Sequence, residues 1–165
     1  MLRQVLTKRS LSTAAASSTK KVVVVDGSRT PFALASTYYK DYMAYDLGVH
    51  AIKGLLTKTA LDPKLVDTVI MGNVIQEVKC PNVAREAALA AGIPNSVPCH
   101  TVVQACISSN QAIANGVAMI QSGQADVIIA GGTETFSDVP IRFSKPMRKK
   151  FIASMKDKTP MAKLQ

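Results

Sequence analysis

The sequence has 165 residues, of which 47% are hydrophobic and 19% are charged. This composition is typical of a folded domain and excludes a disordered chain. The formal net charge of +9 comes from the two ends, because residues 1–20 and 142–165 are strongly basic whereas residues 21–141 hold more acids than bases. With a slightly acidic middle and no Trp for base stacking, the sequence predicts no nucleic-acid partner.

Residues 1–20 (MLRQVLTKRSLSTAAASSTK) are rich in Ser, Ala and basic side chains, and the first acidic residue is Asp26. This pattern is typical of a mitochondrial transit peptide, and it lacks the long apolar stretch of a secretory signal. A basic tail without a targeting role is the alternative interpretation. We therefore expect residues 1–20 to be a transit peptide of a mitochondrial protein.

From residue 21 the chain alternates predicted strands and helices. The β-branched run at residues 22–26 predicts a strand buried on both faces. Asp46 is expected to cap a helix, and a second strand is predicted at residues 66–72. The apolar residues that share one face of the first helix are Leu47, Ala51, Ile52, Leu55 and Leu56.

The second part of the chain continues the alternation. An Ala-rich helix is predicted over residues 82–92 with Asn82 as its N-cap, followed by a strand at 100–105, a helix at 106–122 and a strand at 126–132. The residues expected to face inward on the helix at 106–122 are Ile113, Val117 and Ile120, and the residue expected to end it is Gly123. Strands that alternate with single helices imply parallel βαβ units, so the expected fold is an α/β layered βαβαβαβ sandwich.

The chain has three cysteines, Cys80, Cys99 and Cys106, and an odd number at these spacings favours neither a disulfide framework nor a metal site. Cys106 stands where a predicted strand runs directly into a predicted helix. The free N–H groups and the dipole of a helix start stabilise a thiolate and also an oxyanion on an attacked carbonyl. The competing interpretation is a small, buried and inert side chain, and position alone leaves both open.

The segment around Cys106, Val102–Ala112 (VVQACISSNQA), resembles the nucleophile signature of the thiolase family. Three more segments are similar to thiolase landmarks and stand in the same order: GSRTPF at 27–32, NVAREAALAAG at 82–92 and AGGTETFS at 130–137. The resemblance extends over roughly residues 21–150. Further segments at 72–79 and 137–144 narrow it to the mitochondrial 3-ketoacyl-CoA thiolases of fatty-acid β-oxidation. Two positions depart from the pattern, with Val103 where Asn is usual and Ser109 where Gly is common.

The resemblance implies a two-step acyl transfer with Cys106 as the catalytic nucleophile. Its thiolate would cleave a 3-ketoacyl-CoA, release acetyl-CoA and hold the shortened acyl group as a thioester, which free CoA then collects. No tightly bound cofactor is implied, CoA being a co-substrate, and family members are homodimers. They carry a catalytic His and a second Cys in a C-terminal half of similar fold. Residues 21–141 are therefore expected to be an incomplete thiolase N-terminal domain, and the 165 residues alone to be inactive.

Local residues are not expected to replace the implied partners of Cys106. His100 lies six residues earlier on an extended strand, which corresponds to about 20 Å. A structural or surface role is expected for His50, and Glu134 is interpreted as a hydrogen-bonded structural carboxylate rather than a catalytic one. The role of Cys80 stays open, including a place near the nucleophile.

Residues 142–165 are expected to be the start of a basic loop domain inserted into the thiolase fold. The cluster consists of Arg142, Lys145, Arg148, Lys149 and Lys150. Three interpretations remain open: a solvated basic helix, a surface for anionic mitochondrial lipid, and a site for the phosphates of CoA. A lipid surface would place the protein at the inner membrane rather than free in the matrix.

Two rival functions compete with the thiolase interpretation. A ketoacyl synthase shares the fold and a helix-start cysteine, although the segments at 27–32 and 82–92 favour a thiolase. The second rival is a non-catalytic module that associates with thiolase subunits or with an anionic membrane. Acyl chain length is not predicted from these residues.

Overall fold

The structure is a computed structural model, and it describes residues 20–155 of the chain. The predicted transit peptide, except Lys20, and the end of the basic tail lie outside the described residues. The elements are α1 (Ala44–Thr59), a 3-10 turn η1 (Pro63–Leu65), β1 (Thr68–Gly72), α2 (Val83–Ala90), β2 (Cys99–Val102), α3 (Ser108–Gln121), β3 (Ile128–Gly132) and α4 (Lys145–Ser154).

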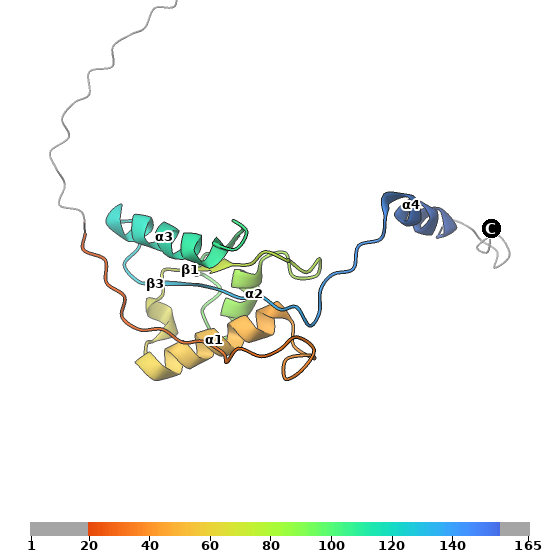
Figure 1. Ribbon diagram of the computed structural model, residues 1–165. Helices are drawn as coiled ribbons and strands as arrows, with labels where there is room; N and C mark the ends of the chain where they lie inside the picture. The colour runs from red at the N-terminus through yellow and green to blue at the C-terminus, as the bar shows by residue number, and fades with distance from the viewer. Residues whose placement is uncertain (1–19, 156–165) are drawn as a thin grey trace, which may run out of the picture.

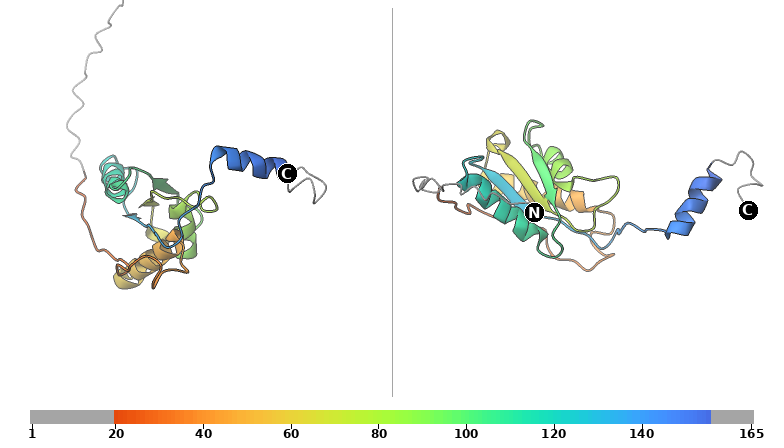
Figure 2. Two further views of the ribbon diagram at one scale, coloured as in Figure 1. Left: turned by 45° about the vertical axis from the view of Figure 1, so that its right-hand side comes forward. Right: turned by 90° about the horizontal axis from the view of Figure 1, so that it is seen from above.

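The three strands form one parallel sheet in the order β2-β1-β3, as Figure 1 shows. Helices α1 and α2 cover one face of the sheet and α3 covers the other, so that the body has three layers (Figure 2). Every residue of the central strand β1 is buried. The parallel α/β sandwich predicted from the sequence is therefore confirmed, with three strands in the described part.

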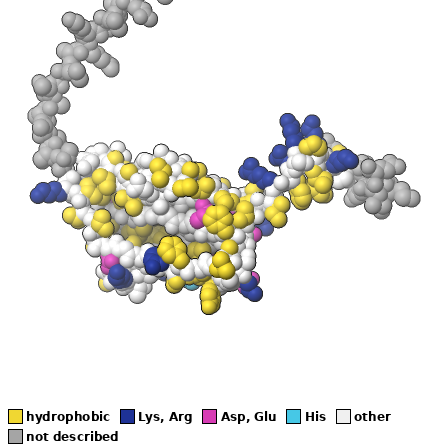
Figure 3. Space-filling model, viewed as in Figure 1, with side chains coloured by type: hydrophobic (Ala, Val, Ile, Leu, Met, Phe, Trp, Pro, Cys, Tyr) yellow, Lys and Arg dark blue, Asp and Glu magenta, His cyan; other side chains and the backbone are white. Residues whose placement is uncertain are grey.

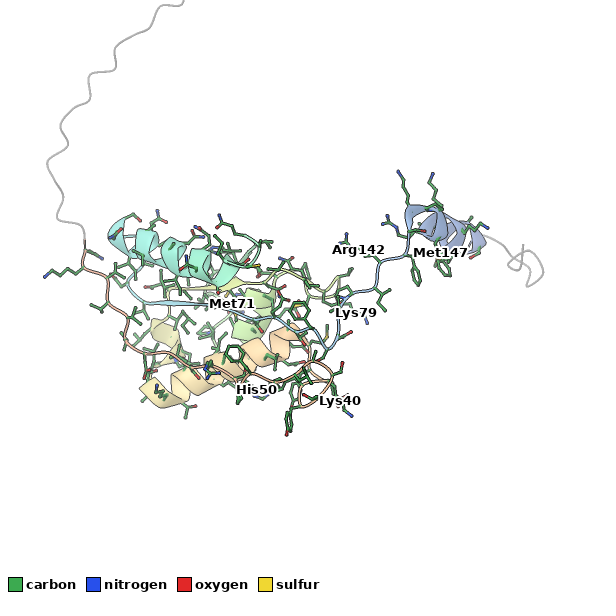
Figure 4. The ribbon with its side chains drawn as sticks, in the orientation of Figure 1. Lys40, His50, Met71, Lys79, Arg142 and Met147 are labelled. Atoms are coloured by element: carbon green, nitrogen blue, oxygen red, sulfur yellow. The ribbon has the colours of Figure 1, made fainter. Side chains whose placement is uncertain are left out.

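The main core lies between the sheet and the α1–α2 layer. It is built from the apolar faces of the two helices and from the sheet, and its largest aliphatic members are Ile52, Leu56, Met71, Ile93 and Ile129. Figure 4 shows Met71 in the sheet, above α1 and α2. Burial of these aliphatic side chains stabilises the fold by roughly 1.5–3 kcal/mol for each fully buried residue.

The N-terminal cap of α2 is formed as predicted, whereas that of α1 is not. The Asn82 side chain accepts a hydrogen bond from the Arg85 N–H at 3.2 Å, so the predicted N-cap of α2 is confirmed. Asp46 is not the cap of α1. The helix begins two residues earlier, and the Asp46 carboxylate in its first turn accepts the Met43 N–H at 2.9 Å, because an acid at the third helical position can reach back to the cap.

The predicted strand at residues 22–26 is wrong in this structure. The segment is extended but joins no sheet, and Val23, Val24 and Val25 are 75–89% exposed. It is fixed on either side by the ion pairs Lys20–Asp126 at 2.6 Å and Asp26–Lys58 at 2.7 Å. A continuous apolar run favours burial on both faces of a strand. No described residue covers these valines, so their side chains stay exposed.

The helix after Cys106 begins later than predicted and uses a different inner face. It starts at Ser108, and its buried positions are Ser108, Ala112 and Gly116, whereas Ile113 is 47% exposed. Small residues face the sheet because the helix lies very close to it; a Cβ on Gly116 would stand 3.3 Å from the Ile128 side chain. The predicted terminator is confirmed, since Gly123 has φ +76° and is followed by the Gln124 N–H bonded to the Met119 carbonyl.

The basic segment past Pro140 leads away from the body into α4 (Figures 1 and 2). Figure 4 places Arg142 on the extended connection and Met147 in the helix. In Figure 3 the basic side chains of α4 gather toward one side and apolar side chains toward the other. Phe143 packs against Phe151 with ring centroids 5.3 Å apart. Between residues 20 and 155 no helix combines the length and the apolarity needed to cross a bilayer.

Candidate active site

An open pocket of about 400 Å³ lies where the strands of the sheet end. Three segments line it: residues 72–75 after β1, residues 105–109 at the turn into α3, and residues 132–136 after β3. The carboxyl ends of parallel strands are the usual binding edge of an α/β sheet. Cys106 lines this pocket and is exposed, so the interpretation of this cysteine as a buried side chain is wrong.

The turn that carries Cys106 is tight and contains an unusual backbone conformation. Ala105 has φ +47°, in the left-handed region that non-glycine residues rarely adopt. The Ile107 N–H donates to the Gln104 carbonyl at 3.2 Å, and the Ser108 N–H donates to the Ala105 carbonyl at 3.1 Å. Cys106 therefore stands on the corner between β2 and α3, two residues before the helix instead of at its first position.

Two glycines let the start of α3 approach the ends of β1 and β3. A Cβ on Gly72 would overlap the backbone of Ser108 and Ser109. A Cβ on Gly132 would stand 2.7 Å from the Ser109 Cβ and 3.0 Å from the Gly72 carbonyl oxygen. Sequence reasoning missed these roles, although a glycine that ends an apolar strand is a signal of close backbone approach.

The wall of the pocket opposite the cysteine turn is held by Asn73 and Glu134. Asn73 is only 3% exposed, and its amide donates to the Thr133 carbonyl at 2.9 Å and to a Glu134 carboxylate oxygen at 3.0 Å. The other Glu134 oxygen accepts the Val74 N–H at 2.8 Å. This agrees with the structural role expected for Glu134, which is half-buried; the sequence had given no reason to single out Asn73.

The two histidines lie away from the pocket. His50 is exposed on α1, where its ring packs edge-on against Tyr42 at 5.7 Å (Figure 4). His100 is exposed on β2. Neither lines the pocket, so no described histidine is placed to activate Cys106, as the sequence led us to expect.

The other two cysteines are less exposed than Cys106, since Cys80 is buried and Cys99 is half-buried. Cys80 is part of the core and lines a different, very small cavity beside Tyr45 and Val83. Burial raises the pKa of the Cys80 thiol to about 12, and a hydrogen bond with Glu86 adds to the shift. Burial also raises the pKa of Cys99. A role for Cys80 beside the nucleophile is therefore not supported, and no group of side chains suited to a metal occurs among residues 20–155.

Selective alkylation is the first test of this arrangement. With iodoacetamide at pH 8, we expect modification of Cys106 well before Cys80, because a thiol with a pKa of about 12 holds only about 10⁻⁴ of its population as the reactive thiolate. The Cys80 thiolate fraction rises tenfold per pH unit, so its labelling should increase steeply with pH. Peptide mass mapping measures both rates, and a denatured sample is the control. Equal labelling of the two cysteines in the folded chain would contradict the structure.

The chain belongs to the thiolase family, because residues 22–163 match the family described as "Thiolase, N-terminal domain". Over 151 residues it is 53% identical to "Trifunctional enzyme subunit beta, mitochondrial" of Bos taurus, with 92% of this chain and 32% of that protein covered. It is 48% identical over 169 residues to "Probable 3-ketoacyl-CoA thiolase" of Caenorhabditis elegans, covering all of this chain and 38% of the relative. The chain thus spans about a third of the length of these relatives.

A solved structure supports the same fold. The Bacillus anthracis acetyl-CoA acetyltransferase matches with a TM-score of 0.74 at 33% sequence identity, over 78% of this chain and 32% of that one. The resemblance to thiolases read from four short segments of the sequence is therefore confirmed at the level of the family and of the fold.

Proposed function

We propose that Cys106 is the nucleophile of a 3-ketoacyl-CoA thiolase, an acetyl-CoA C-acyltransferase of fatty-acid β-oxidation. The observation that carries the proposal is the exposed Cys106 sulfur on the wall of an open pocket, at the corner that leads into α3. The peptide dipoles of α3 favour negative charge near its first turn. A soft nucleophile that is also a good leaving group suits a reaction in which an acyl group is taken up and handed on.

The reaction proceeds in two balanced steps. The Cys106 thiolate attacks the 3-keto carbon, and the C2–C3 bond breaks so that its electron pair leaves on C2 as the enolate of acetyl-CoA, which an acid then protonates. The shortened acyl group remains as a thioester on Cys106. The thiolate of a second CoA attacks that thioester carbonyl, and Cys106 departs as the thiolate. CoA is therefore a co-substrate, and no tightly bound cofactor takes part.

The names of the relatives support the finer points of the proposal. A chain of the trifunctional-enzyme beta type would act in the mitochondrion, in the matrix or at the inner membrane, as a homodimer together with an alpha subunit. Residues 1–20 would be its transit peptide, residues 21–141 its thiolase N-terminal domain and residues 142–165 the start of the loop domain. The general base and the second acid would come from the C-terminal half that thiolases possess.

Trapping of the acyl-thioester tests the proposal. The chain, alone and mixed with the part of the Bos taurus subunit that follows the matched region, is incubated with octanoyl-CoA, quenched at low pH and digested. We expect an octanoyl mass on the peptide that contains Cys106 and none on Cys80 or Cys99. Equal acylation of the three cysteines, or none in either sample, would contradict the proposal. Co-assembly with the bovine part without acylation would favour the non-catalytic module.

We also propose that α4 binds anionic lipid, because this helix is exposed and carries both basic and apolar side chains. All but one of the α4 residues are exposed. Met147 and Phe151, with Met155 just beyond, repeat every fourth position and share one face beside the basic cluster, whereas the exposed Ile152 lies one turn after Arg148. A basic amphipathic helix of this kind binds anionic surfaces, with about 1 kcal/mol for each Lys or Arg near the membrane. This favours lipid over the other two interpretations of the cluster.

Vesicle flotation checks the role of α4. We expect the chain to float with cardiolipin-containing vesicles at low salt and to be released by salt. The triple variant Arg148→Glu, Lys149→Glu, Lys150→Glu should lose binding. The control variant carries the same change of charge on the body, at Lys40, Lys53 and Lys79, and should still float. Binding that is indifferent to salt, or equal loss in both variants, would contradict a specific role for α4.

A further inference from the structure

The turn between β2 and α3 is held by two backbone hydrogen bonds and by one buried hydroxyl group. We propose that Ser108 is the positioning residue of Cys106, and that its hydroxyl fixes the left-handed backbone corner that presents the sulfur to the pocket. This inference rests on the proposed function, because positioning the sulfur matters for catalysis only if Cys106 is the nucleophile. The geometry itself is independent of that assignment.

Ser108 makes bonds on both sides of the corner. It is 4% exposed, and its Oγ accepts the Gln104 N–H at 2.8 Å while donating to the Ala105 carbonyl at 2.6 Å. One side chain therefore binds the last residue before the corner and the corner residue itself. Both bonds are buried or half-buried, where an unmade hydrogen bond is costly.

The corner needs such support because of its backbone conformation. Ala105 has φ +47°, a conformation that brings the Cβ of a non-glycine residue too close to the following carbonyl oxygen. Such a residue persists when its surroundings over-determine it. The N-cap of α3 is Ile107, which has no side-chain hydrogen bond to offer. The side-chain hydrogen bonds at this junction therefore come from Ser108, and they fix the backbone of the corner rather than cap the free N–H groups of the helix.

The consequence for Cys106 follows from its place in the chain. It comes one residue after Ala105, so the direction of its side chain depends on the φ and ψ of the corner. The neighbouring Ser109 provides a contrast: it is exposed, and within the part of the chain that the structure describes its hydroxyl makes no hydrogen bond. Both serines line the pocket, but only Ser108 bonds the backbone of the corner.

The test compares Ser108→Ala with Ser109→Ala in the full 165-residue chain. Amide hydrogen exchange is measured at Gln104 and, as an internal reference, along β1. We expect Ser108→Ala to speed exchange at Gln104 by about tenfold, the effect of losing one net hydrogen bond, with β1 unchanged. Alkylation of Cys106 by iodoacetamide should slow by about threefold or more as the sulfur leaves the field of the α3 start. Ser109→Ala should leave exchange at Gln104 unchanged, because the Ser109 hydroxyl does not bond the corner.

The outcomes separate the inference from the proposed function. Fast exchange of the Gln104 amide in the unaltered chain would overturn the role of Ser108 without any variant. Equal exchange and equal alkylation in Ser108→Ala and the unaltered chain would overturn it as well, and so would faster exchange throughout β1, which indicates a purely structural role. Failure of Cys106 to accept an acyl group, with the Ser108 effects present, would instead overturn the proposed function alone.

Discussion

A Cys106→Ala variant is expected to lose thiolytic turnover by roughly four orders of magnitude or more, the scale on which removal of a covalent nucleophile acts. No other side chain in the pocket can replace the sulfur, since its remaining lining residues contain no Cys, His or Lys. The measurement uses the chain combined with the part of the Bos taurus subunit that follows the matched region. Cleavage of a 3-ketoacyl-CoA is followed with the unaltered and the altered chain.

The matched control for this variant is Cys99→Ala, because Cys99 is half-buried on β2 and does not line the pocket. It should leave turnover within a few-fold of the unaltered complex. The chain without the bovine part is expected to show no turnover, since neither His50 nor His100 reaches the pocket. Retention of a tenth of the activity by Cys106→Ala would end the nucleophile assignment, and normal turnover by the 165 residues alone would mean that they contain their own base.

Replacing Gly72 by alanine should destabilise the fold by about 3 kcal/mol, the upper end of the range for overpacking. The added methyl group would overlap the backbone of Ser108 and Ser109. Backbone at the start of a helix cannot rotate away as a flexible side chain can, so α3 itself must shift. The change in the free energy of unfolding is measured by urea denaturation, with the midpoint and slope compared between variants.

Alanine substitutions at two glycines of β3 serve as comparisons for the Gly72→Ala variant. Gly131→Ala is the control, because a Cβ there meets nothing within 4 Å, and its effect should stay within about 0.5 kcal/mol. Gly132→Ala should also destabilise by much more than Gly131→Ala, since a Cβ there would stand 2.7 Å from the Ser109 Cβ, which is fixed to the α3 backbone, and 3.0 Å from the Gly72 carbonyl oxygen. A Gly72→Ala variant as stable as Gly131→Ala would show that α3 is not seated against the strand ends.

The sequence predicted the elements whose signals are local. Asn82 bonds a residue of its own helix only three positions later, and Gly123 ends its helix through its own positive φ. Both helix ends could therefore be predicted from a few neighbouring residues. The strand predicted at 66–72 is also found, as Thr68–Gly72, because burial on both faces favours the apolar stretch of residues 69–71. These features need no knowledge of what lies across the sheet.

The errors arose where the outcome depends on distant residues. The run at 22–26 has the composition of a strand, but a strand also needs a pairing edge, which composition does not reveal. Ile113 has the apolarity of an inward residue, yet the buried positions of α3 are the small residues Ser108, Ala112 and Gly116. For the site, the helix-start signal singled out Cys106, which the structure places on the wall of the pocket, whereas the contributions of Ser108 and Asn73 are hydrogen bonds that only the assembled turn and loops disclose.

The extended valines at 23–25 have a consequence for handling the protein. Strand β3 pairs only with β1 among the described residues, so its outer edge leaves backbone groups open to pairing. A molecule that combines such an edge with an exposed, unpaired β-branched segment carries both halves of an intermolecular contact. At high concentration, the segment of one copy can dock on the edge of the next, and such contacts propagate without closing. Expression in dilute conditions, or together with a chain that covers this edge, is the way to keep it from aggregating.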